Sequence, residues 1–348
     1  MNQENIFDKQ RRIIYHELMQ IGLEQQECWT EANLILEHVT GIKHAQQIIS
    51  DLDHFKADWL HEITRIINSR RQRMPLAYCL GEVEFAGLSF RIIPGVLIPR
   101  PDTETLVQAV IDRLCMGGVG SIRNARNHWR EHGDTRQDCR GGLHPPAFES
   151  HVSANRFAGV TGDIAEIGIG CGAIAISLLK RLPECTVWAC DISETAITTT
   201  LGNARRHNVH DRLTLVHGDW KKVLPHNLNV VVSNPPYLPL SLQQDMQSAL
   251  QPEVTFEPKS ALFDGSEDGL GFYRQFAEKL PAHFAGAHAA PLQGNELSTP
   301  FAAFEIGDKQ ERSVSDIFKQ SDWQDLSIAR DIHGLPRVLT TSPPDINF

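Results

Sequence analysis

The first 72 residues place apolar side chains at intervals of three and four positions, which is the spacing of amphipathic helices. Two such series are Ile6, Phe7, Ile13, Ile14, Leu18 and Met19, then Phe55, Trp59, Ile63, Ile66 and Ile67. Gly22 and Gly41 stand where helices would end, because glycine readily adopts the left-handed conformation that follows a helix. The pattern predicts a small helical domain.

The pattern changes between Tyr78 and Ile98, where Gly81, Gly87 and the pair Pro94-Gly95 break short apolar runs. Such runs are typical of a β-hairpin. Met74-Pro75 precedes the change, and a residue before proline is disfavoured in a helix. The expected division of the chain is a helical domain at 1–75, a β-hairpin linker at 76–98 and a larger domain at 99–348.

Beyond residue 162, short apolar strands alternate with helices. The predicted strands are 163–167, 186–190, 212–216, 229–233, 302–306, 323–328 and 335–340, and the predicted helices are 173–181, 194–207, 268–280 and 310–319. This alternation indicates an α/β fold with a mostly parallel, seven-stranded sheet covered by helices. A further helix is expected from Asp102, as its N-cap, to about Cys115.

Two stretches lack this periodicity. Residues 116–162 are rich in Gly, His, Arg and Asn, and residues 281–300 are rich in Ala, Pro and Gly. Loops of this length are uncommon inside a compact domain. Both stretches are therefore predicted to be surface insertions of the larger domain, and the first is expected to be disordered.

The composition is that of a globular protein without membrane spans. Hydrophobic residues make up 41% and charged residues 22% of the 348 positions, and no apolar run approaches the roughly 20 residues of a membrane helix. The first residues lack the features of a secretory signal, which predicts a cytoplasmic protein. The cysteine and histidine spacings match neither a disulfide framework nor a standard metal site, so no metal is expected.

The net charge of −10 counts against nucleic acid as a substrate, because a phosphate backbone attracts clustered Lys and Arg. One basic cluster does exist near the end of the helical domain, and we interpret it as a solvated helix face. Its members are Arg65, Arg70, Arg71 and Arg73.

A glycine-rich loop, Gly168-Ile169-Gly170-Cys171-Gly172, lies between a predicted strand and a predicted helix. Doubly wound folds bind ligands at this edge of the sheet, where glycine lets the backbone approach a ligand closely. The same spacing fits a dinucleotide fingerprint. The loop alone therefore leaves a nicotinamide dinucleotide, S-adenosylmethionine and a plain tight turn open.

Acidic residues near the loop are candidate cofactor ligands. Asp191 ends the second strand, about 20 residues past the glycines, where a carboxylate can bind ribose hydroxyls in either cofactor class. Glu166 suits the cationic end of S-adenosylmethionine, or it accepts hydrogen bonds from nearby amides. Asp219 is placed to accept from the adenine amino group, and Trp220 either covers the adenine ring or belongs to the core.

The tetrapeptide Asn234-Pro235-Pro236-Tyr237 follows a buried strand at the same sheet edge. Methyl transfer develops positive charge on an amide or aromatic amino nitrogen, so two acceptors aimed at its hydrogens stabilise the transition state. The Asn234 side-chain oxygen and the Pro235 carbonyl can be these acceptors, and Tyr237 can pack against the flat group. Hydride transfer has no use for such acceptors, which favours a methyltransferase. An ordinary turn is the alternative.

These residues resemble the class I methyltransferases with an NPPY motif, in particular the peptide chain release factor glutamine methyltransferase family. The most specific segment is Leu97-Ile98-Pro99-Arg100-Pro101-Asp102-Thr103-Glu104, and the similarity also covers 31–41, 75–85, 253–258 and 268–270. The chain departs from the family at Glu166, which replaces an aspartate, in its long 116–162 stretch, and in the missing Pro-Gly-Gly turn before Glu305.

The resemblance implies a Rossmann-like class I methyltransferase domain at 99–348 that uses S-adenosylmethionine. It implies methylation of the glutamine side-chain amide in the Gly-Gly-Gln motif of peptide release factors, which the helical domain would dock. Residues 168–172, Asp191, Trp220 and Asn234 would contact the cofactor, and residues 234–237 would hold the glutamine. A monomer is expected.

Other interpretations remain open. In a nucleic-acid amino methyltransferase the tetrapeptide would hold adenine or guanine, but the acidity and the lack of a target-reading module count against it. A ribosomal protein glutamine methyltransferase shares the NPPY motif but differs at residues 97–104. A scaffold that has lost catalysis is disfavoured by the intact glycines, Asp191 and the tetrapeptide.

Overall fold

The computed structural model describes residues 5–50, 52, 54–115, 163–244, 251–284 and 299–344. The predicted insertion at 116–162 lies outside these residues. The chain forms two compact units, and several segments contribute to each. The first unit is Met1–Val83, Arg91–Ile98 and Ser241–Lys259, and the second is Glu84–Phe90, Pro99–Leu240 and Ser260–Phe348. The domain ranges expected from the sequence have other bounds and stay a prediction.

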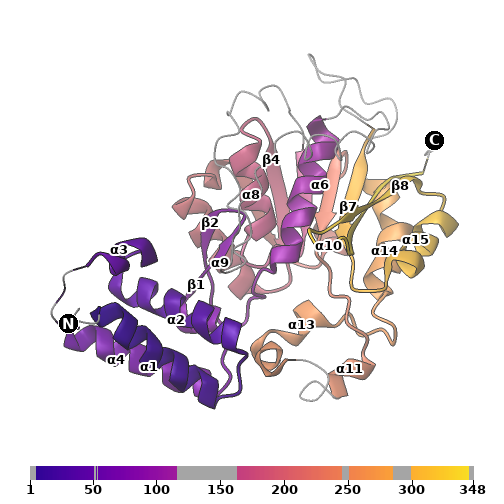
Figure 1. Cartoon of the computed structure of the whole chain (residues 1–348). Coiled ribbons are helices and arrows are strands. Elements are labelled where there is room, and N and C mark those ends of the chain that lie inside the picture. The colour runs from indigo at the N-terminus through magenta and orange to yellow at the C-terminus, as the bar shows by residue number, and fades with distance from the viewer. Residues whose placement is uncertain are drawn as a thin grey trace, which may run out of the picture. The chain divides into compact units, whose positions relative to one another are not determined.

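The first unit, here called the helical unit, confirms the helical pattern of the N-terminal region (Figure 1). Its helices are α1 (Ile6–Gln20), α2 (Gln25–Thr40), α3 (His44–Ile48), α4 (Ala57–Arg71) and α5 (Leu76–Leu80), and the later segment adds α11 (Ser241–Gln244) and the 3-10 helix η4 (Pro252–Phe256). Apolar faces meet in a core that includes Ile14, Leu18, Ile35 and Ile66. Gly41, with φ of 70°, ends α2 as expected.

The hairpin prediction was right in part. Strands β1 (Glu82–Phe85) and β2 (Leu88–Arg91) form a two-stranded sheet, but residues 76–80 form helix α5 and not a strand. Leu and Ala favour helices, and this run holds no β-branched residue. Pro75 precedes the helix, and Gly81 ends it with φ of 74°.

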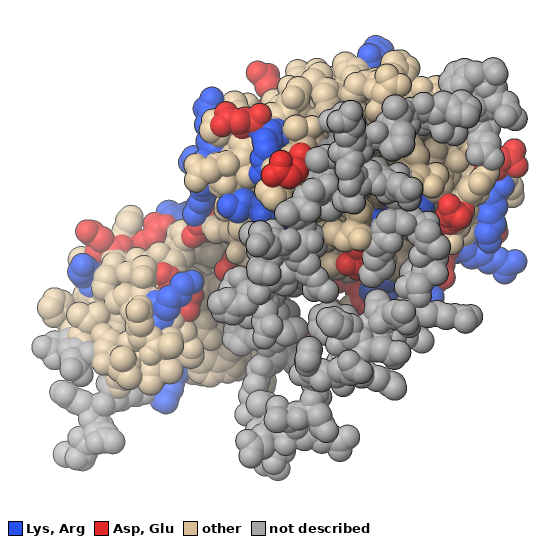
Figure 2. All heavy atoms as spheres, turned by 90° about the horizontal axis from the view of Figure 1, so that it is seen from above, with Lys and Arg blue, Asp and Glu red and all other residues tan. Residues whose placement is uncertain are grey.

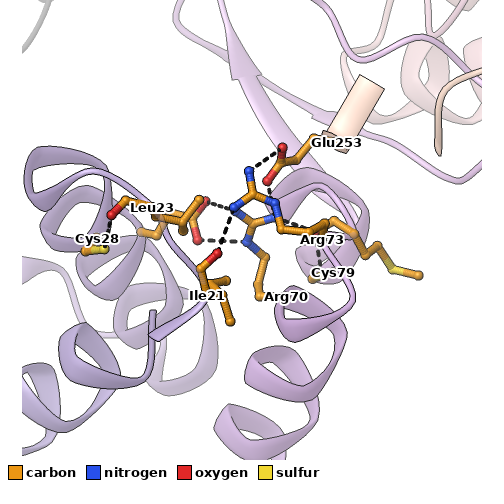
Figure 3. Close-up of polar contacts among 9 residues, drawn as sticks. Ile21, Leu23, Cys28, Arg70, Arg73, Cys79 and Glu253 are labelled. Atoms are coloured by element: carbon orange, nitrogen blue, oxygen red, sulfur yellow. Dashed lines mark hydrogen bonds and ion pairs between the residues drawn. The ribbon is translucent and has the colours of Figure 1, made fainter. Parts of the chain in front are cut away.

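The arginine cluster is not a solvated face throughout, because Arg70 is only 1% exposed. Its Nε and Nη2 donate to the two oxygens of Glu31 at 2.9 and 2.8 Å, and Nη1 lies 3.2 Å from Oε1 of Glu253 (Figure 3). Arg73 reaches the other oxygen of Glu253 at 2.9 Å. Burial lowers the pKa of Arg70, but the two carboxylates outweigh it and hold that pKa above its ordinary value. The later segment of the helical unit is therefore bound through a buried charge network.

The second unit, here called the sheet unit, is built on a seven-stranded sheet in the order β5-β4-β3-β6-β7-β9-β8 (Figure 1). The first five strands are parallel, and β9 is antiparallel to β7 and β8, which confirms the mostly parallel sheet. The strands are β3 (Asp163–Ile167), β4 (Thr186–Asp191), β5 (Leu213–His217), β6 (Val230–Ser233), β7 (Phe301–Glu305), β8 (Gln324–Arg330) and β9 (Pro336–Ser342).

Helices lie between these strands as the alternation predicts, and η1 and α6 precede the first strand, β3. They are α6 (Glu104–Cys115), α8 (Ala173–Arg181), α9 (Glu194–Arg206), α10 (Trp220–Val223), α13 (Lys259–Leu262), α14 (Gly271–Lys279) and α15 (Glu311–Gln320), with 3-10 turns η1 (Pro101–Thr103), η3 (His210–Arg212) and η5 (Leu280–His283). An aromatic stack fixes β7, because Phe304 lies 4.9 Å from Phe276 and 5.3 Å from Phe318 between ring centroids.

Two local predictions need correction. Asp102 does not cap α6, because it lies inside the 3-10 turn η1, which begins at Pro101. Its carboxylate pairs instead with the Arg337 guanidinium at 2.8 Å. Residues 281–284 of the expected second insertion are part of the fold. Phe284 is buried and packs edge-on against Trp323, with centroids 5.8 Å apart.

Candidate active site

The strand register aligns the carboxyl ends of four parallel strands, β4, β3, β6 and β7, in one row. Ile167 pairs with Cys190 and with Ser233, and Ser233 pairs with Phe304. The next residue of each strand stands at the carboxyl edge of the sheet: Gly168, Asp191, Asn234 and Glu305. The Ser233 hydroxyl donates to the Ile167 carbonyl at 2.7 Å and holds this register. The glycine loop and the tetrapeptide therefore start side by side.

The three glycines of the loop have different roles. Gly168, Gly170 and Gly172 all have positive φ, of 79°, 57° and 85°. A Cβ at Gly168 or Gly170 would meet nothing within 4 Å, so the backbone there borders open space. A Cβ at Gly172 would lie 2.8 Å from Cγ2 of Thr200, because this glycine packs against α9. Two glycines thus leave room for a ligand, and the third permits helix packing.

Side chains of α9, which the sequence did not single out, hold the loop. Thr200 donates to the carbonyl of Gly170 at 2.9 Å, and Asn203 donates to the carbonyl of Cys171 at 2.8 Å. The side chains of Ile169 and Cys171 point into the protein and are 3% exposed each. Burial raises the pKa of the Cys171 thiol to about 12, so it is not a nucleophile.

The two acids nearest the loop differ in burial. Asp191 is half-buried and accepts from the backbone N–H of Gly170 at 3.1 Å and of Ser193 at 2.8 Å. Glu166 is 1% exposed, and burial raises its pKa well above the ordinary value, although a hydrogen bond from the Ala175 backbone lowers it. Among the described residues, Oε2 of Glu166 has no hydrogen-bond partner. A buried carboxyl oxygen without a partner, two residues before the open backbone of Gly168, fits a cationic ligand group.

Asp219 and Trp220 occupy the start of α10. The Asp219 carboxylate accepts from the backbone N–H of Lys221 at 3.1 Å and so caps this helix. Trp220 is 5% exposed, and its ring meets Phe276 edge-on at 5.2 Å. The structure thus gives Trp220 the core position that the sequence left as an alternative.

The tetrapeptide is enclosed by residues from distant parts of the sheet unit. Nδ2 of Asn234 donates to the Thr103 hydroxyl at 3.2 Å, and Gln310 donates to the Tyr237 carbonyl at 3.0 Å. A Cβ on Gly307 would lie 2.9 Å from the Tyr237 ring, and a Cβ on Gly269 would collide with the Tyr237 carbonyl. Pro235 is buried and Pro236 half-buried, while burial raises the pKa of Tyr237. The tetrapeptide is therefore held by packing as well as by its prolines.

Glu305 is a site residue that the sequence reasoning missed as such. It ends β7 and is 2% exposed, and Tyr273 donates to its backbone carbonyl at 2.7 Å. Burial raises the pKa of its carboxyl to about 7, while hydrogen bonds from Thr103 and Asn234 lower it. The signal in the sequence was an acid that directly follows the apolar run 301–304.

The sheet order, the open glycine loop and the tetrapeptide beside it define a class I methyltransferase. The Methyltransferase small domain model matches residues 148–257, and the PrmC N-terminal domain model matches residues 14–81. A release factor glutamine methyltransferase of Geobacter sulfurreducens is 32% identical over 276 residues, covering 79% of this chain and 75% of that protein. The chain belongs to the release factor glutamine methyltransferase family.

Other relatives differ in length. A bifunctional methyltransferase of Rickettsia felis is 32% identical over 336 residues, which cover 95% of this chain but 56% of that protein. The chain thus spans about half the length of such relatives. A crystal structure of a methyltransferase from Pyrococcus furiosus aligns over 53% of this chain and 76% of that one, with 16% identity and a TM-score of 0.38. No helix in the described part of the chain is long and apolar enough to cross a bilayer.

Proposed function

We propose that this chain transfers a methyl group from S-adenosylmethionine to the side-chain amide nitrogen of the glutamine in the Gly-Gly-Gln motif of peptide release factors. It would thus be a protein-(glutamine-N5) methyltransferase. The observation that carries this proposal is the shared sheet edge, where the open glycine loop stands next to Asn234. Membership of the family supports the choice of substrate. A cytoplasmic location is part of the proposal, because release factors act there.

The residues at the loop fit the cofactor. The open backbone at Gly168 and Gly170 would accept its amino acid portion, and Glu166 would face the ammonium group with its unpartnered oxygen. Asp191 lies at the next strand end, where its partly exposed carboxylate would bind the ribose. Asp219 would approach the adenine. When bound, the cofactor supplies an electrophilic methyl group on a sulfonium centre.

The chain contributes positioning and charge stabilisation at the acceptor nitrogen. The Asn234 oxygen and the Pro235 carbonyl would accept the two amide hydrogens, and this interaction strengthens as the nitrogen becomes positive. Tyr237 would pack against the flat amide. Its raised pKa keeps the phenol neutral, so it acts by shape and not as a base.

The surface supports a protein substrate over nucleic acid. On the face shown in Figure 2, Lys and Arg side chains are interspersed with Asp and Glu side chains. The net charge of −10 would also repel a phosphate backbone. A ribosomal protein glutamine or a nucleic-acid amino group is the competing acceptor, and both are arms of the test below.

Labelled S-adenosylmethionine, mixed with the protein and separately with release factor, ribosomal protein, duplex DNA and ribosomal RNA, tests the proposal. Label should appear on the release factor and should be lost when the glutamine of its Gly-Gly-Gln motif is replaced by alanine. Label confined to nucleic acid or to ribosomal protein would overturn the proposed substrate.

The variant Asn234→Ala tests the role of the tetrapeptide. Loss of one preorganised transition-state contact is expected to lower kcat by about 100-fold to 1000-fold. The dissociation constant of the cofactor, measured by calorimetry, should change little, because the loop that would bind it is intact. Turnover at the unaltered rate would refute the acceptor role of Asn234.

A further inference from the structure

A buried carboxyl adjoins the acceptor residue of the tetrapeptide. Glu305 from β7, Thr103 from η1 and Asn234 after β6 come from three distant stretches of the sheet unit. Glu305 and Thr103 are 2% and 3% exposed, and hydrogen bonding from Thr103 and Asn234 lowers the pKa of the Glu305 carboxyl against the effect of burial, which raises it. Nδ2 of Asn234 also lies 3.2 Å from the Thr103 hydroxyl oxygen. The three polar groups therefore adjoin one another.

The donor and acceptor capacities of these groups determine how Asn234 is turned. An ionised carboxylate can only accept, so in a hydrogen bond between Thr103 and Glu305 the Thr103 hydroxyl must be the donor. The Thr103 oxygen can then only accept, and it requires the NH₂ end of the Asn234 amide. The oxygen of Asn234 is thereby turned away from Thr103.

We propose that Glu305, directly and through Thr103, is a positioning residue that turns the Asn234 amide so that its oxygen faces the acceptor nitrogen of the substrate. This inference rests on the function proposed above. An asparagine amide has two ends of nearly equal size, so packing alone does not select between them. In the flipped orientation its NH₂ group would face the NH₂ group of the substrate glutamine, and both would be donors.

The charge state of Glu305 governs this arrangement. The groups that act on it electrostatically are Asp102 of η1, Arg337 of β9, Tyr237 after β6 and Tyr273 of α14. Its Oε2 has no hydrogen-bond partner within the described residues. Burial raises its pKa to about 7. A protonated Glu305 can donate to Thr103, which frees the Thr103 proton for the Asn234 oxygen and permits the flip.

Kinetic variants test the inference. Thr103→Val and Glu305→Gln should each lower kcat by about tenfold to a hundredfold, while the cofactor dissociation constant changes less than about twofold. Thr103→Ser keeps the hydroxyl and should recover most of the loss. The kcat of the unaltered protein should fall as pH drops through about 7, and Glu305→Gln should remove this limb. Asp112→Asn, a half-buried carboxyl of α6, is the control and should leave kcat unchanged.

A second measurement does not depend on turnover. The side-chain NH₂ resonances of Asn234, identified by their loss in Asn234→Ala, should shift with a midpoint near pH 7 and should not shift in Glu305→Gln. Equal kcat in the Val and Ser variants, or NH₂ resonances without that transition, would overturn the inference. If the unaltered protein leaves release factor unlabelled but shows the NMR transition, the proposed substrate fails and the orientation of Asn234 stands.

Discussion

The two units of this protein differ in how many hydrogen-bond partners their buried charged side chains have. In the helical unit, Arg70 is fully buried and its guanidinium meets both oxygens of Glu31, an oxygen of Glu253 and the carbonyl of Met74. In the sheet unit, Glu166 and Glu305 are equally buried, yet within the described residues each keeps one oxygen without a partner.

This difference in hydrogen-bond partners distinguishes buried charges that stabilise the fold from buried carboxyls that a ligand would use. A buried charge whose hydrogen-bonding capacity is met within the protein contributes to the fold, and removal of one partner is costly. A buried carboxyl with an unmet oxygen reduces stability and persists where a ligand or a reaction uses it. Both carboxyls of the second kind lie at or near the edge that carries the glycine loop and the tetrapeptide.

The largest effect on stability is expected for Arg70→Met. The variant leaves Glu31 buried without its cation and Glu253 with Arg73 alone, which should cost about 3–5 kcal/mol of unfolding free energy, measured by urea denaturation. Arg65→Met on the same helix removes a half-exposed pair with Glu62 and should cost less than about 1 kcal/mol. Equal losses of unfolding free energy in the two variants would show that the burial and pairing of Arg70 do not contribute to stability.

Glu305 should destabilise the fold in a pH-dependent way. Its folded pKa of about 7 exceeds the ordinary 4.5, so the folded state binds the proton more tightly than the unfolded state. The unfolding free energy should therefore fall as pH rises from about 4.5 to 7, by an amount on the order of 3 kcal/mol. Unfolding of Glu305→Gln at pH 5 and pH 8 should lack this fall. An identical pH dependence in both proteins would contradict the assignment.

A smaller effect is expected at Glu166, in binding and not in folding. Glu166→Gln should weaken the binding of S-adenosylmethionine by about tenfold, or 1.4 kcal/mol, as measured by calorimetric titration. The melting temperature should not fall, because the variant removes a buried carboxyl whose oxygen is unmet. Glu166→Asp keeps a carboxyl group and should bind the cofactor nearly as well. A lower melting temperature with unaltered affinity would place Glu166 among the structural charges.

The smallest effect is expected at an exposed pair, Asp268 with Arg274. The arginine holds the pKa of Asp268 at about 2, so this pair contributes above the unfolded pKa and is lost as pH falls toward 2. Both side chains are about half exposed, and Arg274→Ala should cost less than about 1 kcal/mol at pH 7. High salt should abolish even that difference. A cost comparable to that of Arg70→Met would remove the distinction between buried and exposed pairs.

The elements of the sheet were predictable because their signals are local. Helix 173–181 and strand 163–167 were predicted with the bounds that the structure has, since apolar periodicity and the glycine turn lie within a few residues. The Asn234 to Tyr237 motif was equally local. The contacts of the motif were not predictable, because Thr103 is 131 residues from Asn234 and Gln310 is 73 residues from Tyr237 along the chain.

Arg70 and residues 76–80 were predicted wrongly for different reasons. Arg70 was assigned to solvent because its partner Glu253 is 183 residues away, and no local pattern shows that a charge is buried. Residues 76–80 carry helix-favouring Leu and Ala between Pro75 and Gly81, but their apolar run was assigned to the hairpin that follows it. Sequence reasoning thus placed the glycine loop and the tetrapeptide at one sheet edge and missed the distant side chains that contact them.

The segment Ser241–Lys259 has a consequence for protein engineering. It follows the tetrapeptide in sequence, yet it belongs to the helical unit through Glu253 and through Glu257, which accepts from the Ile98 N–H at 3.1 Å. Chimaeras that exchange residues 1–83 alone between homologues would keep Arg70 with Glu31 but would separate Arg70 and Arg73 from Glu253 of the same protein. A chimaera that is to keep this charge network must therefore carry both stretches together.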